Sequence, residues 1–389
     1  MARLACPYCY HRIPASRLWY QCSGQSAPGF KPCTPAKDPD RERETGWRMP
    51  ARPAFGPQRK FGPAPRKEVC PACHGLSGVR VCPCCHTPLS VNFAESTSPL
   101  IAMVGAKNTG KTVYLTVLSQ ELRTGLRRRF GADVRLSGDQ PSATSTTDLY
   151  SNRKLFEQTA QANDGRRDPL VFEWRQERQV MRRTTFKTSF LSFYDTAGED
   201  LISQNSVHDL QYLGAADALI LLLDPFMLPQ ARDRVQLPEA AVKAGEPTID
   251  VLSRVTEKLR VAHEVRAKHK IDIPVSVAFA KIDAFYDELG SDHPVLRTPP
   301  AGAEYDDAGG QDVHEHIRAL LHEWGADDID THLRFNYAKF RYFAVSALGA
   351  QPNYSTKEID PGGIRPHRVD EPLVWLLSKF GVVPVRGKS

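Results

Sequence analysis

The sequence has no cysteine after Cys85 and no uninterrupted run of about 18 apolar residues. A bilayer-spanning helix needs a run of roughly that length, so no membrane segment and no membrane contact are predicted. The N-terminal stretch MARLACPYCYHRIP also lacks the apolar core of a signal peptide, and we expect a cytoplasmic protein. Apolar residues make up 41% and charged residues 25% of the 389 residues, which is ordinary for a folded chain of more than one domain.

Positive charge is concentrated near the N-terminus. Residues 1–97 hold 14 Lys and Arg against 6 Asp and Glu, whereas the remainder holds 37 against 39. A basic module joined to a neutral one can indicate nucleic acid or an acidic partner. The alternative, which we favour, is solubility together with compensation for the negative charge of thiolate-bound zinc. Nucleic-acid binding therefore stays open at this point.

The cysteines have the spacing of zinc ligands. Eight of the nine form two quartets, Cys6, Cys9, Cys22 and Cys33, then Cys70, Cys73, Cys82 and Cys85. Because cytosolic chains make little use of disulfides, paired CxxC knuckles predict tetrahedral sites for one or two Zn²⁺ ions. The second quartet has zinc-ribbon spacing, while the first is looser. A crossed pairing, in which Cys6 and Cys9 close a site with Cys82 and Cys85, is the alternative.

Cys84, His74 and His86 remain outside the quartets, and we expect each to be a neighbour rather than a ligand. A reduced, metal-free cluster is less favoured, because such small segments need a staple to fold. A redox role for the CxxC pairs is also less favoured, because no βαβ pattern follows them.

Two domains are predicted, a cysteine-rich zinc-binding module over residues 1–95 and a second domain over residues 96–389. Residues 34–69 contain seven prolines and many charges, and we expect them to form a flexible or extended insertion within the first module.

The second domain opens with the pattern GxxxxGK[ST]. The apolar residues 100–104 predict a buried strand, residues 112–126 keep helical apolar spacing, and the loop between them is Gly105, Ala106, Lys107, Asn108, Thr109, Gly110, Lys111 and Thr112. In such a loop, backbone N–H groups and the positive end of the helix dipole bind phosphate. Lys111 is expected to bridge the β- and γ-phosphates, and the Thr112 hydroxyl to ligate Mg²⁺.

Three further motifs follow at strand ends. Asp195 to Gly198, with the sequence DTAG, comes after the strand predicted at residues 190–194. The next apolar run, residues 216–225, predicts a strand that is covered on both faces. The strands predicted at residues 273–283 and 340–349 carry Ala280-Lys-Ile-Asp283 and Ser346-Ala347. Together these elements predict an α/β fold, a doubly wound and mainly parallel sheet of the P-loop NTPase type, preceded by a small zinc-ribbon-like module.

With these motifs, residues 97–385 resemble the TRAFAC-class GTPases, which include the Ras-like and translation-factor G domains. The resemblance implies GTP or GDP with Mg²⁺ as ligands. It implies that Asp195 holds Mg²⁺ through water, that Gly198 contacts the γ-phosphate, and that Lys281, Asp283, Ser346 and Ala347 bind the guanine base. The cysteine knuckles before such a domain also look like those of the double-GTPase proteins of bacterial conflict systems. That similarity implies a partner GTPase and separate effector proteins.

The chain departs from the family pattern at two positions. Ala280 replaces the residue whose amide normally braces the base, and Glu199 stands where Ras-like proteins carry a water-orienting Gln. A carboxylate near the γ-phosphate repels negative charge, so slow intrinsic hydrolysis is expected.

Two other positions are open. The threonine of switch I can be Thr144, Thr146, Thr147, Thr184 or Thr185. Asn108 occupies the position at which several potassium-activated GTPases coordinate K⁺; the alternative, which we favour, is that Asn simply fits the turn.

The sequence thus predicts a GTP-hydrolysing molecular switch that recruits protein partners through its zinc ribbons. An ATP-using P-loop NTPase is one alternative, suggested by Ala280 and opposed by Asp283 and by Ser346-Ala347. A scaffold that binds nucleotide without hydrolysing it is the other.

Overall fold

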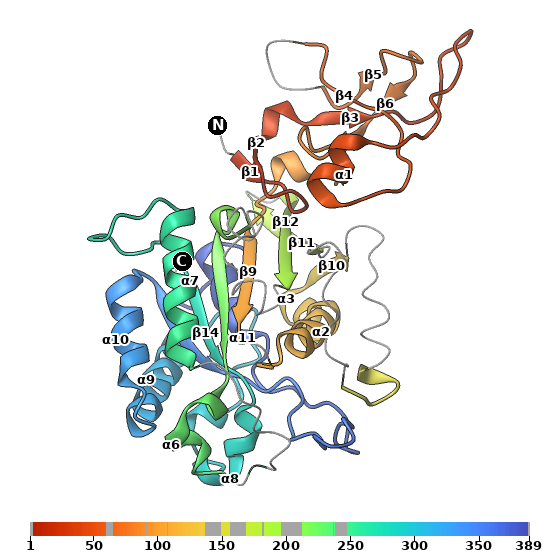
Figure 1. The fold of residues 1–389 in the computed structure, drawn as a ribbon. Helices are drawn as coiled ribbons and strands as arrows, with labels where there is room; N and C mark the ends of the chain where they lie inside the picture. The colour runs from red at the N-terminus through yellow and green to blue at the C-terminus, as the bar shows by residue number, and fades with distance from the viewer. Residues whose placement is uncertain are drawn as a thin grey trace. The chain divides into compact units, whose positions relative to one another are not determined.

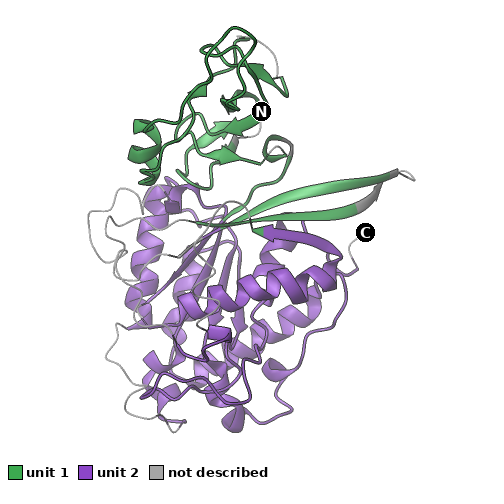
Figure 2. Cartoon of the chain, turned by 90° about the vertical axis from the view of Figure 1, so that its right-hand side faces the viewer, with its two compact units in different colours: residues 1–100, 136–138, 162–192 green, residues 101–135, 139–161, 193–389 purple. Residues whose placement is uncertain are grey.

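The structure is a computed structural model that describes most of the chain, namely residues 3–59, 65–90, 92–106, 108–136, 149–155, 169–180, 183–195, 212–235, 237 and 247–387. The chain forms two compact units, which are coloured separately in Figure 2. Unit 1 comprises residues 1–100, 136–138 and 162–192, and unit 2 comprises residues 101–135, 139–161 and 193–389.

The N-terminal part of unit 1 is built from very short antiparallel strands. The four-stranded sheet has the order β4-β3-β7-β8, with β3 at Trp19–Gln21, β4 at Ala54–Phe55, β7 at Val79–Val81 and β8 at Pro88–Leu89. Two further pairs are β1 (Arg3–Ala5) with β2 (Arg12–Pro14) and β5 (Glu68–Val69) with β6 (Leu76–Ser77). Short 3₁₀ turns lie at Ala15–Arg17 and Phe93–Glu95. Strands of two or three residues bury little apolar surface, so the stability of this module must come largely from cross-links between its segments.

The proline-rich insertion contains regular structure, and the expectation of a flexible or extended segment is wrong for part of it. Helix α1 spans Pro39–Thr45, and β4 pairs with β3. The helix starts where the Asp38 side chain accepts a hydrogen bond from the Arg41 N–H at 3.0 Å, and it ends at Gly46 with φ of 73°. An Asp N-cap, a Pro at the first helical position and a Gly C-cap are helix signals that overall composition conceals.

A seven-stranded, mostly parallel sheet has the order β10-β11-β12-β9-β13-β14-β15 (Figure 1). Its strands are β9 (Leu100–Gly105), β10 (Ala132–Leu136), β11 (Leu170–Val180), β12 (Arg183–Asp195), β13 (Ala218–Leu223), β14 (Val275–Phe279) and β15 (Phe340–Ala344). The β9–β13, β13–β14 and β14–β15 pairs are all parallel. The boundary between the two units runs through β9 and β12.

The central strands form where the sequence has continuous apolar runs. Every residue of β9, β13 and β14 is buried, as expected for parallel strands that are covered on both faces. The strands predicted at these positions and at β15 are therefore confirmed, although β13, β14 and β15 are each shorter than predicted.

The helices with described bounds in unit 2 include α2 (Lys111–Glu121), α3 (Arg127–Phe130), α6 (Pro229–Arg232), α7 (Thr248–Ala262), α8 (Tyr286–Leu289), α9 (Asp307–Glu323), α10 (Asp327–Asn336) and α11 (Glu371–Lys379). A π-helical turn at Leu122–Leu126 joins α2 to α3, and 3₁₀ turns lie at Pro225–Met227, Ile282–Phe285 and Pro294–Leu296. The helix predicted at residues 112–126 corresponds to α2 and the π-helical turn that follows it. The first seven residues of α11 are buried, and the helix packs on β14.

Candidate nucleotide and zinc sites

The strands of unit 2 bring four chain segments to one edge of the sheet. Gly105 of β9 pairs with Leu222 of β13, Leu223 with Phe279 of β14, and Phe279 with Ala344 of β15. Because these strands are parallel and in register, their carboxyl ends are level. The residues that follow them begin at the same edge, where open α/β sheets bind ligands.

The loop after β9 has the backbone that its glycines predict. Gly110 has φ of 87° and Asn108 has φ of 65°, both in the left-handed region that Gly and Asn tolerate best. A Cβ added to Gly105 would lie 2.6 Å from the carbonyl oxygen of Leu222, so this position excludes any side chain. The buried Thr109 hydroxyl donates to the Ala106 carbonyl at 2.9 Å and closes the turn.

Lys111, the first residue of α2, points back into this loop. Its Nζ donates to the carbonyl oxygens of Gly105 and Ala106, each at 2.8 Å, and the residue is only 8% exposed. Thr112 follows in the first turn of the same helix. A buried ammonium group thus lies beside the N-terminus of an 11-residue helix, which is an arrangement suited to binding an anion.

Several predicted residues lie outside the described part of the chain. These are Lys107, Thr144, Thr146, Thr147, Gly198 and Glu199. Asp195 is the last residue of β12, but its side chain is not described. Thr184 and Thr185 lie within β12 and are exposed.

Lys281 forms an ion pair that sequence reasoning missed. Its Nζ donates to Oδ2 of Asp224, the residue directly after β13, and lies 5.0 Å from the ring centroid of Phe226. Asp224 is 5% exposed, and its Oδ1 accepts a hydrogen bond from the Phe226 N–H at 3.0 Å. Lys281 itself has φ of 58°. The sequence did contain a signal for this ion pair. Asp224 directly follows a wholly apolar strand, and a carboxylate buried at such a place needs a positively charged or hydrogen-bonding partner.

Asp283 and Ser346 meet at the same edge, as their motifs predict. Burial raises the pKa of the Asp283 carboxyl above its ordinary value, and a hydrogen bond with the Ser346 side chain opposes that shift. The Ser346 Oγ also accepts from the Gly349 N–H at 2.8 Å, which orients the loop that carries Ala347. The Asp283 carboxylate is therefore partly buried in the segment after β14, and it is hydrogen-bonded to Ser346 in the segment after β15.

Two tyrosines border this carboxylate. Burial raises the pKa of Tyr286 to about 12, and the charge of Asp283 adds to the effect. Burial also raises the pKa of Tyr354, with further contributions from Asp283 and Asp224. The charges of both carboxylates thus act on Tyr354, and nothing in its local sequence pointed to this.

The cysteines form two four-thiol groups with the crossed pairing. In the first group the Cys6 and Cys85 Sγ atoms lie 3.8 Å apart, and those of Cys9 and Cys82 lie 3.7 Å apart. A tetrahedral zinc ion with Zn–S bonds of about 2.3 Å requires sulfurs roughly 3.8 Å apart. All four residues are buried, so the donor set fits Zn²⁺.

The second group consists of Cys22, Cys33, Cys70 and Cys73. The Cys22 and Cys73 Sγ atoms lie 3.5 Å apart, and those of Cys33 and Cys70 lie 3.9 Å apart. The assignment of the quartets in sequence order is thus wrong, while the eight predicted ligands are the ones brought together.

Antiparallel pairing of β3 with β7 explains the crossing. Gln21 pairs with Val79, which places Cys22 at the end of the sheet from which β7 enters, towards Cys73. Trp19 pairs with Val81, so Cys82 leaves β7 at the opposite end. The two cysteines that follow these strands must therefore belong to different sites.

The three knuckles share one turn, which accounts for the leftover histidines. In each knuckle the fourth residue after the first cysteine donates its N–H to that cysteine's carbonyl, at 2.9 Å, and has positive φ: Tyr10, His74 and His86. His86 then contacts Asp38 at 2.8 Å and stacks on Trp19, while His74 contacts Phe30. Both histidines are neighbours of the thiol groups, as predicted.

Comparison with known proteins adds one clear relationship. No protein-family model matches the chain. Within the described residues, no helix combines the length and the apolar character needed to cross a membrane. A protein of Mycolicibacterium smegmatis, the putative ESX-1 scaffolding and assembly protein SaeC, is 30% identical over 369 residues, which cover 88% of this chain and 87% of the relative. Because the similarity extends over nearly the whole of both chains, this chain belongs to the same family as that protein.

Proposed function

We propose that this protein is a guanine-nucleotide-binding P-loop protein, a G domain in fold, whose nucleotide state controls the assembly of protein partners. One observation carries the proposal. Lys111 and its glycine-rich loop lie at the same sheet edge as Lys281, Asp283 and Ser346. One end of this edge suits phosphate and the other suits a purine base.

The phosphate end offers groups suited to binding the phosphates of a nucleotide. Lys111 would exchange its two carbonyl contacts for phosphate oxygens, and the N–H groups at the start of α2 would complete the cradle. Mg²⁺, held by Thr112 and Asp195, would neutralise charge between the phosphates. Glu199 in place of a water-orienting amide would keep hydrolysis slow without help from a partner.

The base end favours guanine over adenine. The Asp283 carboxylate can accept hydrogen bonds from both N1–H and the exocyclic amine of guanine, a donor pair that adenine lacks. The Lys281 stem, fixed by Asp224, would cover one face of the base. Ala280 cannot brace the base through an amide, which is the observation in favour of the ATP-using alternative.

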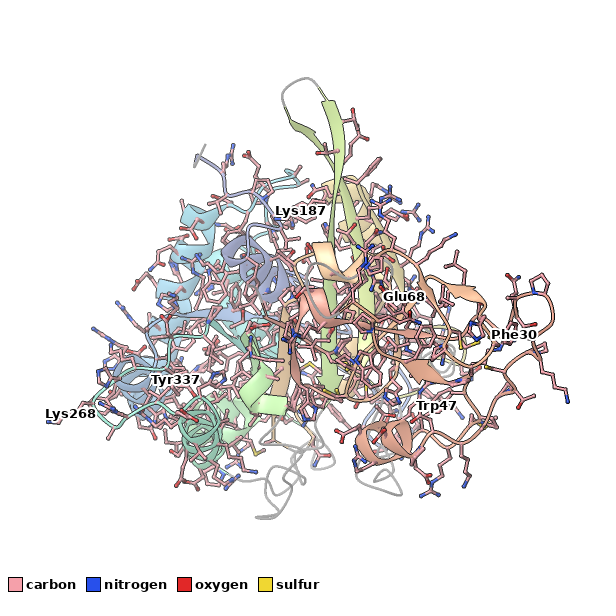
Figure 3. The ribbon with its side chains drawn as sticks, turned by 90° about the horizontal axis from the view of Figure 1, so that it is seen from above. Phe30, Trp47, Glu68, Lys187, Lys268 and Tyr337 are labelled. Atoms are coloured by element: carbon pink, nitrogen blue, oxygen red, sulfur yellow. The ribbon has the colours of Figure 1, made fainter. Side chains whose placement is uncertain are left out.

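The partners are proposed to be proteins. The relative is described as a scaffolding and assembly protein, and the zinc module of this chain is the candidate recruiting surface. Its exposed apolar side chains include Phe30 (labelled in Figure 3), Met49 and Leu76. A partner GTPase, by resemblance to the double-GTPase proteins, is one candidate. A scaffold without hydrolysis is the second candidate function, favoured by Glu199 and by the relative's description.

Equilibrium binding of fluorescent GTP, GDP and ATP to the full chain with Mg²⁺ tests the nucleotide. GTP should bind at least about tenfold more tightly than ATP. Adenine lacks the N1–H and exocyclic amine pair of guanine, so ATP would leave the Asp283 carboxylate without these hydrogen-bond donors. Equal affinity for both, or no binding of either, contradicts the proposal. Turnover of GTP with and without the zinc module's partners then separates a switch from a non-hydrolysing scaffold.

A further inference from the structure

A second surface of unit 2 lies at the carboxyl ends of helices α7 and α10. Among the described residues of unit 2, the exposed large apolar side chains are Val261, 63% exposed, and Phe335, 73% exposed. They belong to these two helices, in the last turn of each. Exposed apolar side chains that gather at one place are a mark of interaction sites.

The two helices run parallel, side by side. The Thr256 hydroxyl contacts His332 Nε2 at 2.8 Å, and one turn later the Arg260 guanidinium donates to Asn336 Oδ1 at 2.9 Å. Contacts that advance together along both helices require parallel axes. Each residue turns about 100° around a helix, so the residue after Arg260 and the residue before Asn336 turn to the same side. Val261 and Phe335 therefore form one patch.

The loop after α7 is held in place beside this patch. Arg260 Nη1 donates to the carbonyl oxygens of Arg266 and His269, at 3.1 and 3.0 Å. The buried Ile271 closes the loop, since its N–H donates to the Asn336 carbonyl at 2.8 Å. A loop that is already ordered loses little entropy when a partner binds.

This loop presents positive charge. Arg266, Lys268 and Lys270 are exposed, and Lys268 projects outward in Figure 3. Residues 257–272 and 334–339 together hold seven Lys and Arg against three Asp and Glu. The rest of the chain after residue 97 holds 30 Lys and Arg against 36 Asp and Glu, so the positive charge is local to these two segments.

We propose that the patch formed by Val261, Phe335 and the loop at residues 263–271 docks an acidic segment of a protein partner that carries an apolar side chain. The apolar pair would bury the partner's side chain, and the loop cations would face its carboxylates. The patch lies where the helices lead into the amino ends of β14 and β15. The proposed nucleotide site is at the carboxyl edge of the same sheet. An experiment can therefore refute the docking proposal without affecting the proposed nucleotide site, and the reverse.

Photo-crosslinking tests this docking in the full chain. p-Benzoylphenylalanine is placed at position 335, or at the exposed position 322 on α9 as a control, and cells making the protein are irradiated. Mass spectrometry then maps the crosslinked segment. The expected result is a crosslink from position 335 to a segment of another protein rich in Asp and Glu with at least one apolar residue, and none of this kind from position 322.

Charge reversal is the second arm. Lys268→Glu with Lys270→Glu should reduce the crosslink yield about tenfold, because like charges would then face each other. Arg127→Glu with Arg128→Glu, exposed on α3, is the matched control and should leave the yield unchanged. A crosslink from position 335 to a second copy of this chain, to nucleic acid or to lipid overturns the proposal, as does no crosslink or a yield unaffected by reversing Lys268 and Lys270.

Discussion

Lys111→Ala should abolish nucleotide binding at micromolar concentrations while leaving the protein folded. The Lys111 Nζ makes two hydrogen bonds of 2.8 Å in the structure, to Gly105 and Ala106, and its position allows about the same number to phosphate oxygens. A hydrogen bond involving a charged group contributes roughly 1.5–3 kcal/mol. Losing two such bonds costs about 3–6 kcal/mol, which corresponds to an affinity loss between about a hundredfold and ten-thousandfold.

The assay is titration of a fluorescent GTP analogue with Mg²⁺, alongside circular dichroism and thermal unfolding. Lys111→Arg keeps the charge but not the compact ammonium, and should bind with intermediate affinity. Lys339→Ala, which removes an exposed lysine of the same unit, is the control and should bind as the wild type does. Near-native GTP affinity in a folded Lys111→Ala protein would refute the assignment of this loop to phosphate.

Four other outcomes are expected. Asp283→Asn should shift preference from GTP to XTP, because an amide can donate to the extra carbonyl of xanthine; the exposed Asp287→Asn is the control, and an unchanged GTP over XTP ratio would exclude Asp283 as the base reader. Wild-type GTP binding should weaken as the pH falls through the raised pKa of Asp283, since protonation removes the acceptor, and XTP binding by Asp283→Asn should lack this step. Metal analysis should find two zinc ions per chain, and replacing Cys6, Cys9, Cys82 and Cys85 together by Ser should leave one, whereas pairing in sequence order would leave none. If Asn108 coordinates K⁺, GTP turnover should be faster in KCl than in NaCl at equal ionic strength, and Asn108→Ala should remove the difference.

The central strands of unit 2 and helix α2 were predictable because each is a local pattern. A continuous apolar run marks a strand covered on both faces, and the runs at β9 and β13 are buried at every residue. A fixed-spacing loop then marks the turn into α2. The parallel strands are in register, so their carboxyl ends are level. This register brings Lys281, Asp283 and Ser346 to the sheet edge that carries Lys111.

The grouping of the cysteines into two sites was not predictable in the same way. The spacing of Cys70, Cys73, Cys82 and Cys85 is that of a single ribbon, and local patterns favour it. The structure separates the two knuckles because the short strand between them, β7, pairs with the distant β3 rather than folding back on itself. Strands of three residues are too short for their sequence to indicate which strand they pair with. The sequence could therefore offer the crossed grouping of the cysteines only as an alternative.

The base end of the candidate site shows how a departure from a motif can be offset by a residue outside it. Ala280 is 7% exposed at the end of β14 and its N–H donates to the Leu223 carbonyl at 2.9 Å, so this position closes the sheet and offers no polar side chain. Asp224, directly after Leu223 on the neighbouring strand, instead supplies the carboxylate that fixes Lys281. A buried carboxylate with an ammonium partner and an N–H donor keeps one geometry, because losing either contact would leave charge unpaired. The orientation of Lys281 therefore comes from β13, the strand beside the motif.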